Sequence, residues 1–247
     1  MTSFIIAHLY PNLMNLYGDR GNLICLQKRL EWLGYDCRVK SLDIGDEWNF
    51  ADVDMIFMGG GSDREQSLVY DDLQCKKEEL WREIKNGFPV LFICGSYQLL
   101  GSYYLTGQGF KMEGLNYFDF FSEGGPKRLI GNIVVEVKNN NETYQVIGFE
   151  NHGGYTYFND TTLRPWGKVI KGHGNNGKDH TEGIIFNNLI GTYLHGPLLP
   201  KNPAVADFFI RVMMARKGIN IDSGCLTDKI ENYARQQVLA KVMKIKS

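Results

Sequence analysis

The sequence predicts an α/β protein with a mostly parallel central sheet, helices flanking that sheet, and an antiparallel β extension. In the first hundred residues, short apolar runs alternate with segments of helical periodicity, a pattern typical of parallel strands joined by helical crossovers. Beyond Gly114, neighbouring strand-like segments are separated by short polar turns, which predicts hairpins. No long linker or internal repeat divides the 247 residues, so we expect residues 1–247 to form one domain.

The first half should contain three strands and two long helices. Short apolar runs predict strands at residues 3–10, 53–60 and 89–94. Leucines at helical spacing predict a helix over 22–34, which Gly34 ends. A second helix should begin at the capping box formed by Ser62 and Glu65 and continue to about Asn86.

The second half should contain two hairpins followed by two helices. The first hairpin joins residues 128–137 to 143–150, and the second covers 182–196 with its turn at Asn187–Asn188. The next helix should begin at Asn202–Pro203 and end at Gly218, because proline is favoured at the first helical position. A last helix is expected over about 227–244.

The composition limits the possible classes of function. With 27 basic and 28 acidic residues, the chain has none of the basic surplus typical of nucleic-acid binding. No apolar run reaches the roughly 20 residues of a membrane helix, and the N-terminus reads as a strand, not as a signal peptide. The five cysteines form no CxxC pair, which favours a reducing cytoplasm over disulfides or a zinc site; they are Cys25, Cys37, Cys75, Cys94 and Cys225.

Cys94 is the cysteine whose setting suits catalysis. It ends the run "PVLFIC" and is followed by Gly95, Ser96 and a helix-like segment at 97–105. Such a strand–turn–helix corner is a nucleophile elbow, where small neighbours let the side chain project outward. The helix N-terminus favours the thiolate, and the N–H of Gly95 can donate to a developing oxyanion. A buried structural cysteine is the alternative, and it is the interpretation we favour for the other four.

A glycine-rich loop, "MGGGSDREQ" at 58–66, ends the neighbouring strand. Glycines at 59–61 let backbone N–H groups approach a ligand closely. Beside Cys94, this loop is expected to supply the second half of an oxyanion hole. A plain strand-to-helix turn is the alternative.

A cysteine nucleophile needs a base, and the chain has five histidines. His195 ends a predicted strand and is followed by glycine and proline, so it is the expected base. His152, in a loop at a strand end, is the reserve. His8 lies inside the first strand and should be structural, while His173 and His180 flank a loop that looks mobile and solvated.

One phosphate-binding pattern is set aside. The segment "GHGNNGKD" at 172–179 fits G-x-x-x-x-G-K, but Asp179 stands where a P-loop needs Ser or Thr. We find no convincing strand before it and no helix after it. The chain therefore shows no ATP site of its own.

Five blocks of the chain together carry a family resemblance. "FICGSYQ" matches the signature Gly-x-Cys-Gly-Gly-Tyr-Gln at four positions, with Phe92 and Ser96 in place of two glycines. That signature belongs to the cobyric-acid-synthase-like branch of class I glutamine amidotransferases, which this chain resembles. Four further blocks narrow the resemblance to the glutaminase subunits of lipid II isoglutaminyl synthases: "LYPNLMNLYGDRGN" (9–22), "GGGSDREQ" (59–66), "GFENHGG" (148–154) and "GTYLHGPLLPKNP" (191–203).

The resemblance implies a flavodoxin-like fold and a thioester mechanism. Cys94 would attack the side-chain amide of glutamine, releasing ammonia, and water would then free glutamate. His195 would be the general base and acid. Backbone N–H groups near Gly60 and Gly95 would hold the oxyanion.

Two substrate-binding residues are also implied by the resemblance. Arg128 matches the position that clamps the α-carboxylate of free glutamine, a role that suits a guanidinium because it can form two parallel hydrogen bonds. Its alternative is a surface arginine in a loop. Gln98 is expected to help place the substrate.

The chain departs from many relatives two residues after the catalytic histidine, where Pro197 replaces an orienting glutamate. We expect a backbone carbonyl, or a carboxylate from a partner, to orient His195 instead. Asp19, at the end of the first strand, is the internal candidate but the less favoured one.

The function implied by the resemblance is that of an amidotransferase subunit. It would hydrolyse L-glutamine and pass ammonia to a Mur-ligase-like partner of the MurT type, which amidates the D-glutamate α-carboxyl of the lipid II stem peptide. ATP and Mg²⁺ would be used by that partner, and this chain would need no cofactor or metal. Alternatives are amidation of another carboxylate such as a cobyrinate-type corrinoid, a non-catalytic regulatory subunit, and a free-standing cysteine hydrolase.

Overall fold

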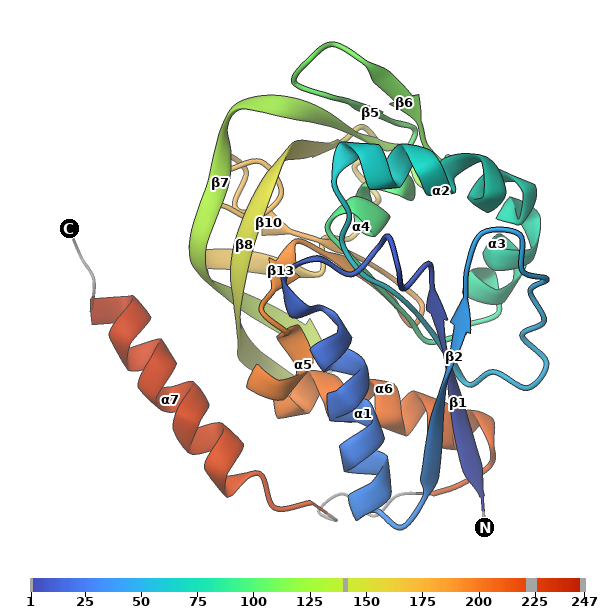
Figure 1. Ribbon diagram of the computed structural model, residues 1–247. Coiled ribbons are helices and arrows are strands. Elements are labelled where there is room, and N and C mark those ends of the chain that lie inside the picture. The colour runs from blue at the N-terminus through green and yellow to red at the C-terminus, as the bar shows by residue number, and fades with distance from the viewer. Residues whose placement is uncertain (1, 140–141, 221–225, 245–247) are drawn as a thin grey trace.

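A six-stranded sheet forms the centre of the structure, a computed structural model that describes residues 2–139, 142–220 and 226–244 (Figure 1). Its strand order is β11-β12-β4-β3-β1-β2, and all neighbours are parallel except β11, which is antiparallel to β12. The strands are β1 (Ser3–Leu9), β2 (Asp36–Leu42), β3 (Met55–Met58), β4 (Val90–Ile93), β11 (Ile184–Phe186) and β12 (Leu189–Thr192). The three strands expected in the first half are confirmed, as is the hairpin turning at Asn187–Asn188.

Strand β2 was not predicted, because it lies at the edge of the sheet. Most of its side chains are exposed or half-buried, and only Cys37 and Leu42 are buried. The sequence "DCRVKSL" therefore lacks the apolar run that marks the inner strands.

Helices cover both faces of the central sheet. Phe4 and Ile6 point to the face covered by α1 (Arg20–Trp32) and α6 (Pro203–Arg216), whose apolar side chains share one core with them. Ala7 and Leu9 point to the opposite face, which α2 (Asp63–Cys75) and α3 (Lys77–Lys85) cover. This three-layer arrangement is the one that alternating strands and helices predict.

Two of the expected helices are interrupted. The helix expected over 62–86 is broken at Lys76, where the backbone leaves the helical region and separates α2 from α3. The helix expected after Cys94 is only α4 (Gly95–Leu99), because the chain then turns into strand β5 (Tyr103–Leu105). Gly101 permits this turn: a Cβ there would lie 2.5 Å from the Phe120 ring and carbonyl.

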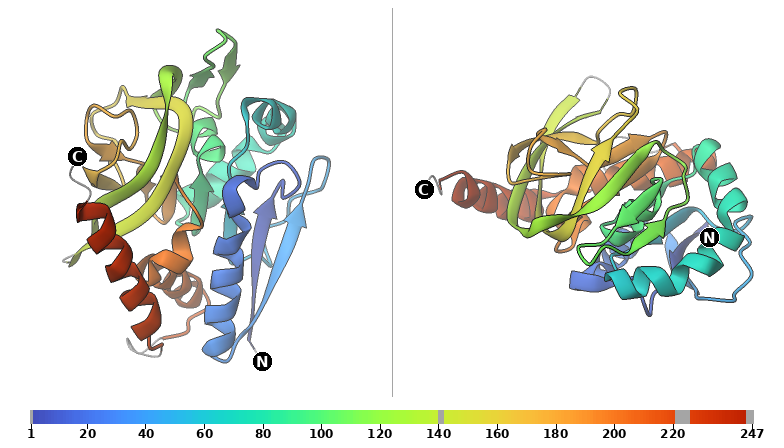
Figure 2. Two further views of the ribbon diagram at one scale, coloured as in Figure 1. Left: turned by 60° about the vertical axis from the view of Figure 1, so that its left-hand side comes forward. Right: turned by 90° about the horizontal axis from the view of Figure 1, so that it is seen from above.

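A long hairpin organises the second sheet (Figure 2). The hairpin expected around residues 128–150 is confirmed, but its strands extend much further, with a register shift between Gly124 and Leu129. The strands of this sheet are β5, β6 (Lys111–Glu113), β7 (Phe120–Asn139), β8 (Glu142–Phe158), β9 (Gly167–Lys171), β10 (Thr181–Glu182) and β13 (Leu194–His195). The pairing of β13 with β8 joins this sheet to the catalytic region.

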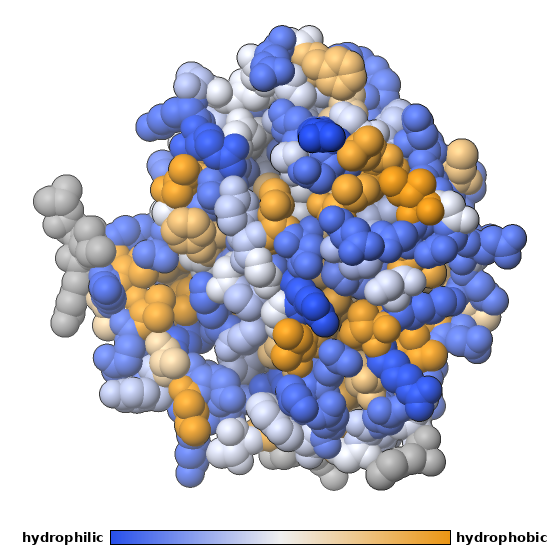
Figure 3. Space-filling view, viewed as in Figure 1, coloured by the Kyte–Doolittle hydropathy of each residue, from blue (hydrophilic) through white to orange (hydrophobic). Residues whose placement is uncertain are grey.

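The chain ends in the two helices that the sequence predicts, α6 and α7 (Lys229–Lys244), with the short α5 (Leu198–Lys201) before them. Helix α7 lies at the edge of the molecule, where Leu239 and Val242 pack against the β7/β8 hairpin (Figure 1). Ile230 and Tyr233 on this helix are 81% and 64% exposed. Figure 3 shows orange, hydrophobic surface among blue at its left edge, where α7 lies. No helix within the described ranges is both long and apolar enough to cross a membrane.

Candidate active site

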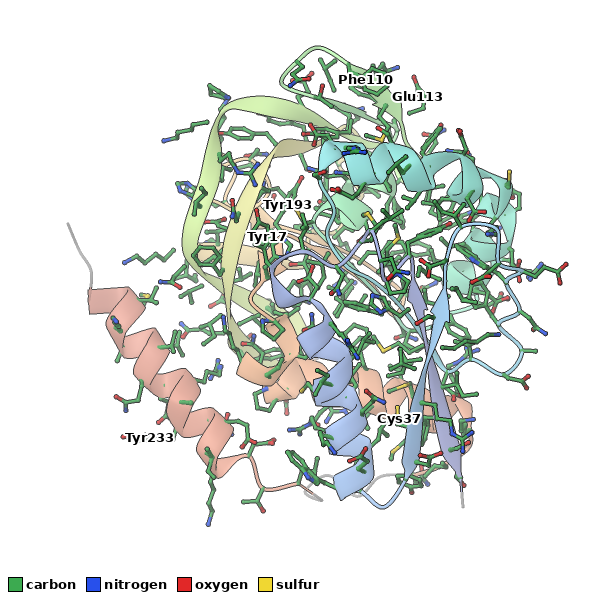
Figure 4. All side chains as sticks on the ribbon, in the orientation of Figure 1. Tyr17, Cys37, Phe110, Glu113, Tyr193 and Tyr233 are labelled. Atoms are coloured by element: carbon green, nitrogen blue, oxygen red, sulfur yellow. The ribbon has the colours of Figure 1, made fainter. Side chains whose placement is uncertain are left out.

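The carboxyl ends of the parallel strands bring the predicted catalytic residues together. Strands β12 and β4 are in register, with Thr192 opposite Ile93, and the backbone N–H of Cys94 donates to the Thr192 carbonyl at 2.8 Å. His195, three residues beyond Thr192, therefore lies beside Cys94. Figure 4 shows Tyr17 and Tyr193 at this end of the sheet and Cys37 towards the other end.

The nucleophile elbow is present at Cys94. Its backbone has φ 56° and ψ −106°, outside the regions that side-chain-bearing residues normally adopt, and α4 begins at the next residue. Ser96 stabilises this corner, because its hydroxyl accepts from the Ile93 N–H at 2.7 Å and donates to the Met58 carbonyl at 2.8 Å. Strain of this kind is found at functional sites, where the surrounding structure holds the residue in place.

A carboxylate of this chain orients the imidazole. Asp19 Oδ1 lies 3.0 Å from His195 Nδ1, and both side chains are fully buried. The expectation of a backbone carbonyl or a partner carboxylate is wrong in this structure. Asp19 reaches His195 because β1 and β12 end at the same edge of the sheet, although β3 and β4 lie between these two strands.

The charges around His195 favour its protonated form. Burial alone lowers the pKa of His195, but Asp19 and the Cys94 sulfur outweigh burial and raise that pKa to about 10. Tyr17 covers the imidazole, with the two ring centroids 5.0 Å apart and the rings edge-on. Nε2 of His195 has no hydrogen-bond partner among the described residues, so this nitrogen is free for proton exchange with Cys94 and substrate.

The glycine loop lies against both catalytic side chains. A Cβ on Gly60 would be 2.9 Å from His195 Cε1 and 3.4 Å from Cys94 Cβ, so no side chain fits there. The N–H of Gly60 donates to Asp19 Oδ2 at 2.8 Å, so the prediction that this N–H holds the oxyanion is wrong. The N–H groups of Gly61 and Gly95 donate to no other described residue and remain available.

Arg128 contacts a residue of β8 whose side chain is on the same face of the sheet as the side chain of His195. His195 is paired with Phe149, and Asn151, two residues further along β8, shares that face. Nε and Nη2 of Arg128 donate to Asn151 Oδ1 at 3.1 and 3.0 Å, and Nη2 also donates to the Asn151 carbonyl at 2.9 Å. Nη1 has no hydrogen-bond partner among the described residues, and a Cβ on Gly153 would lie 3.5 Å from it.

Gln98 is held inside a buried hydrogen-bond network. Its Oε1 accepts from Gln66 Nε2 at 3.2 Å, and its Nε2 donates to the Tyr193 hydroxyl at 3.1 Å. Both ends of the carboxamide therefore have partners within the chain. Its predicted contact with substrate would need one of these bonds to open.

The reserve base, His152, lies within β8 and not in a loop as expected. Its Nδ1 donates to the Gly154 carbonyl at 2.7 Å, and its ring stacks on Tyr193 with centroids 3.6 Å apart. Burial lowers the pKa of His152. His152 is thus packed beside the site, and no described bond joins it to Cys94. His8 is buried in β1, as predicted.

The loop at 172–180 is exposed at residues 177–180, as expected for a solvated segment, but its middle is buried. Asn175 and Asn176 are 1% and 2% exposed, and the N–H groups of His173 and Gly174 donate to the buried carboxylate of Glu150. The loop joins β9 to β10, so a strand precedes it but no helix follows. A carboxylate already occupies the N–H groups that a phosphate would need.

The other described cysteines have no catalytic setting. Burial raises the pKa of Cys25 and of Cys37 to about 12, which keeps both thiols protonated. Cys75 is exposed on α2. Cys225 lies outside the described residues. The described residues include no cluster of three potential metal ligands from His, Cys, Asp and Glu.

The arrangement is that of a cysteine–histidine–aspartate triad with two free backbone donors. Such a site activates a thiol, binds a tetrahedral oxyanion and protonates a leaving group, which is the chemistry of acyl transfer. Asp19 is the member of the triad that sequence reasoning ranked too low. Its one signal was a position in the loop that follows β1, on the side of the sheet where the other parallel strands also end.

Sequence comparison identifies relatives of the same kind. Residues 5–203 match the CobB/CobQ-like glutamine amidotransferase domain. The chain is 40% identical over 240 residues to the Staphylococcus aureus lipid II isoglutaminyl synthase (glutamine-hydrolyzing) subunit GatD, covering 97% of this chain and 96% of that protein. It is also 40% identical over 213 residues to GatD of Streptococcus pneumoniae, covering 86% and 81%.

More distant relatives share the fold. A probable cobyric acid synthase of Methanocaldococcus jannaschii is 30% identical over 221 residues, covering 85% of this chain but 43% of that protein. A glutamine amidotransferase structure from Thermotoga maritima superposes with a TM-score of 0.54 at 14% identity, covering 99% of each chain. The glutaminase domain of Trypanosoma brucei CTPS gives a TM-score of 0.57 at 15% identity, covering 92% and 98%.

Proposed function

The chain belongs to the CobB/CobQ-like glutamine amidotransferase family, and we propose that it is the glutaminase subunit of a lipid II isoglutaminyl synthase. In this role it hydrolyses L-glutamine and delivers ammonia to a ligase subunit. The ligase amidates the α-carboxyl of D-glutamate in the lipid II stem peptide, forming D-isoglutamine.

The proposed reaction uses the triad in two half-reactions. The Cys94 thiolate attacks the side-chain amide carbon of glutamine, and the resulting oxyanion is held by the N–H groups of Gly61 and Gly95. The His195 imidazolium protonates the nitrogen as the C–N bond breaks, which releases ammonia and leaves a thioester. Neutral His195 then takes a proton from water, whose oxygen attacks the thioester carbon. Glutamate leaves, and the thiolate–imidazolium pair is restored.

Asp19 and Arg128 have supporting roles in this mechanism. Asp19 stabilises the imidazolium and fixes its orientation, so that Nε2 faces the reaction. Arg128 would receive the α-carboxylate of free glutamine through Nη1, and through Nη2 if its bond to the Asn151 carbonyl opens.

The partner is proposed to be a Mur-ligase-like subunit of the MurT type, which would bind ATP and Mg²⁺. This chain would then need neither, because its own chemistry requires only the thiol, the imidazole and water. We place the reaction in the cytoplasm, where the free thiols of the described cysteines would stay reduced.

The observation that carries the proposal is the pairing of this triad with near full-length similarity to two GatD subunits. Cobyric acid synthases are the alternative relatives, but this chain spans less than half the length of the one compared. An ammonia-supplying role for a cobyrinate-type corrinoid is therefore less favoured.

The test uses the complex of this chain with its co-purified ligase. Cys94→Ala should abolish glutamine-dependent amidation of lipid II and leave ammonia-dependent amidation unchanged. Loss of both activities, or of neither, would contradict the assignment and favour a regulatory subunit. A free-standing hydrolase would instead be favoured if this chain, without the ligase subunit, released glutamate as fast as the complex does.

A further inference from the structure

Gln66 is a buried polar side chain that the mechanism above does not use. It lies in the first turns of α2, five residues after Gly61, and is 2% exposed. Its carboxamide packs against the residue that follows the nucleophile: a Cβ on Gly95 would lie 2.9 Å from both Cδ and Nε2 of Gln66. Gln66 therefore touches one half of the oxyanion hole.

The same carboxamide also forms a hydrogen bond with Gly61, which supplies the other N–H group of the oxyanion hole. Nε2 of Gln66 donates to the Gly61 carbonyl at 3.4 Å and to Gln98 Oε1 at 3.2 Å. Gly61 belongs to the loop after β3, whereas Gln98 belongs to the helix after Cys94. One amide group thus joins the two segments that supply the free N–H donors.

The rest of the glycine loop is already tied to other groups. The Gly60 N–H donates to Asp19, and the Gly60 carbonyl accepts from the Leu16 N–H at 3.0 Å. Because the peptide unit is planar and trans, the N–H of Gly61 points away from Leu16. The peptide unit that follows, between Gly61 and Ser62, is held through its carbonyl, which accepts a hydrogen bond from Gln66 Nε2.

The network continues from Gln98 into the hairpin sheet. Gln98 donates to the Tyr193 hydroxyl, which is hydrogen-bonded to Thr156 at 2.7 Å, and Thr156 is hydrogen-bonded to Ser122 at 2.7 Å. All of these side chains are at least 97% buried. A buried and connected network of this kind holds its members in one arrangement.

We propose that Gln66 is a positioning residue for the oxyanion hole. It would hold the Gly61 loop against the nucleophile elbow, so that the Gly61 and Gly95 N–H groups converge on one oxygen. The inference rests on the proposed glutaminase function. Gln98 would then also be a positioning residue, because its carboxamide links Gln66 to the Tyr193 hydroxyl by hydrogen bonds.

The role has a kinetic signature, because the oxyanion exists only in the tetrahedral states. Misplaced donors weaken the transition state and leave ground-state binding of glutamine unchanged. Loss of one oxyanion donor costs about 100- to 1,000-fold in kcat in a well-studied protease, so loss of its support should cost about 10- to 100-fold.

The experiment measures glutamine hydrolysis by the complex for Gln66→Met, Gln66→Glu and the matched control Gln74→Met. Gln74 lies on the same helix, and its Nε2 donates to the Gly114 carbonyl at 2.9 Å. Both Gln66 variants lose the Nε2 donor with little change in side-chain volume. We expect kcat to fall about 10- to 100-fold in both, KM to change less than about threefold, and the control to match the wild type.

A second readout separates positioning from general damage to the fold. The γ-aldehyde analogue of glutamine forms a hemithioacetal with Cys94, which places an oxygen in the oxyanion hole. Its inhibition constant should rise by the factor by which kcat falls. Unchanged kcat in both Gln66 variants, an equal loss in Gln74→Met, or a rise in KM alone would overturn the role of Gln66. A wild-type complex that releases no glutamate would instead overturn the proposed function.

Discussion

Asp19 and His195 are 176 residues apart in the sequence, yet Asp19 Oδ1 lies 3.0 Å from His195 Nδ1 in a fully buried pair. The other carboxylate oxygen of Asp19 accepts from the Gly60 N–H at 2.8 Å. One carboxylate therefore orients the general acid and also fixes the loop beside the nucleophile. This double use explains how the site works without a glutamate two residues after His195.

Asp19→Asn should reduce kcat for glutamine hydrolysis by at least about 100-fold, because the amide does not stabilise the imidazolium. The pKa of His195, now about 10, should fall. The alkaline limb of the pH profile of kcat/KM should then move to lower pH. Steady-state rates between pH 6 and 10 test this, with the exposed Asp52→Asn as control. An unshifted alkaline limb would count against the pairing.

The same pair predicts how stability depends on pH. The pKa of His195 is higher in the folded protein, about 10, than the ordinary value of 6.5. Its stabilising contribution is therefore complete below about pH 6.5 and is lost as the pH rises through 10. The difference in melting temperature between wild type and Asp19→Asn should shrink from pH 6.5 to pH 10. A difference that stays constant or grows over this range would contradict the prediction.

Gly60→Ala should inactivate the site without unfolding the protein. The added methyl group would lie 2.9 Å from Cε1 of the fully buried His195 imidazole and 3.4 Å from Cys94 Cβ, so it would displace the catalytic imidazole. We expect kcat to fall at least about 100-fold. Gly107→Ala is the control, because no atom lies within 4 Å of a Cβ at that position. Comparable kcat values in the two variants would show that Gly60 is not close to the reacting groups.

Arg128→Ala should raise KM for glutamine about 10- to 100-fold with a smaller effect on kcat, because the α-carboxylate is remote from the scissile bond. Arg128→Lys should recover part of the affinity, since an ammonium retains the charge but not the planar fork. Initial rates over a range of glutamine concentrations test both variants. A loss confined to kcat would place Arg128 outside the substrate-binding site.

A glutamine-mimicking electrophile, such as a γ-chloromethyl ketone, should label Cys94 and no other described cysteine. The thiols of Cys25 and Cys37 have pKa values raised to about 12 by burial, so their thiolate fraction at neutral pH is negligible. Cys75 is exposed, so any modification of its thiol should be one that glutamine does not prevent. Peptide mapping after labelling, with excess glutamine as competitor, checks the site. Modification of Cys94 that glutamine does not prevent would contradict it.

Much of the fold could be predicted from local patterns. Inner strands such as β4 are short apolar runs, α2 has its capping box, and the β7/β8 hairpin alternates around a polar turn. Predictions from local patterns were wrong or incomplete where contacts with other parts of the fold determined the secondary structure. Residues 103–105 read as helix but pair with β7 as a strand, and β2 is too polar at the edge of the sheet to stand out.

Local sequence also determined which side chain would be the nucleophile, because an elbow needs a strand, small neighbours and a helix in unbroken order around Cys94. It identified His195 as the base for the same reason, as a residue at the end of a strand. Only the tertiary structure decided what lies next to them. The choice of Asp19 over a partner group, and of Gly61 over Gly60 as an oxyanion donor, depends on the order of strands in the sheet and on the direction of single N–H bonds. These properties arise from contacts between segments far apart in the chain, and spacing along the sequence carries no record of them.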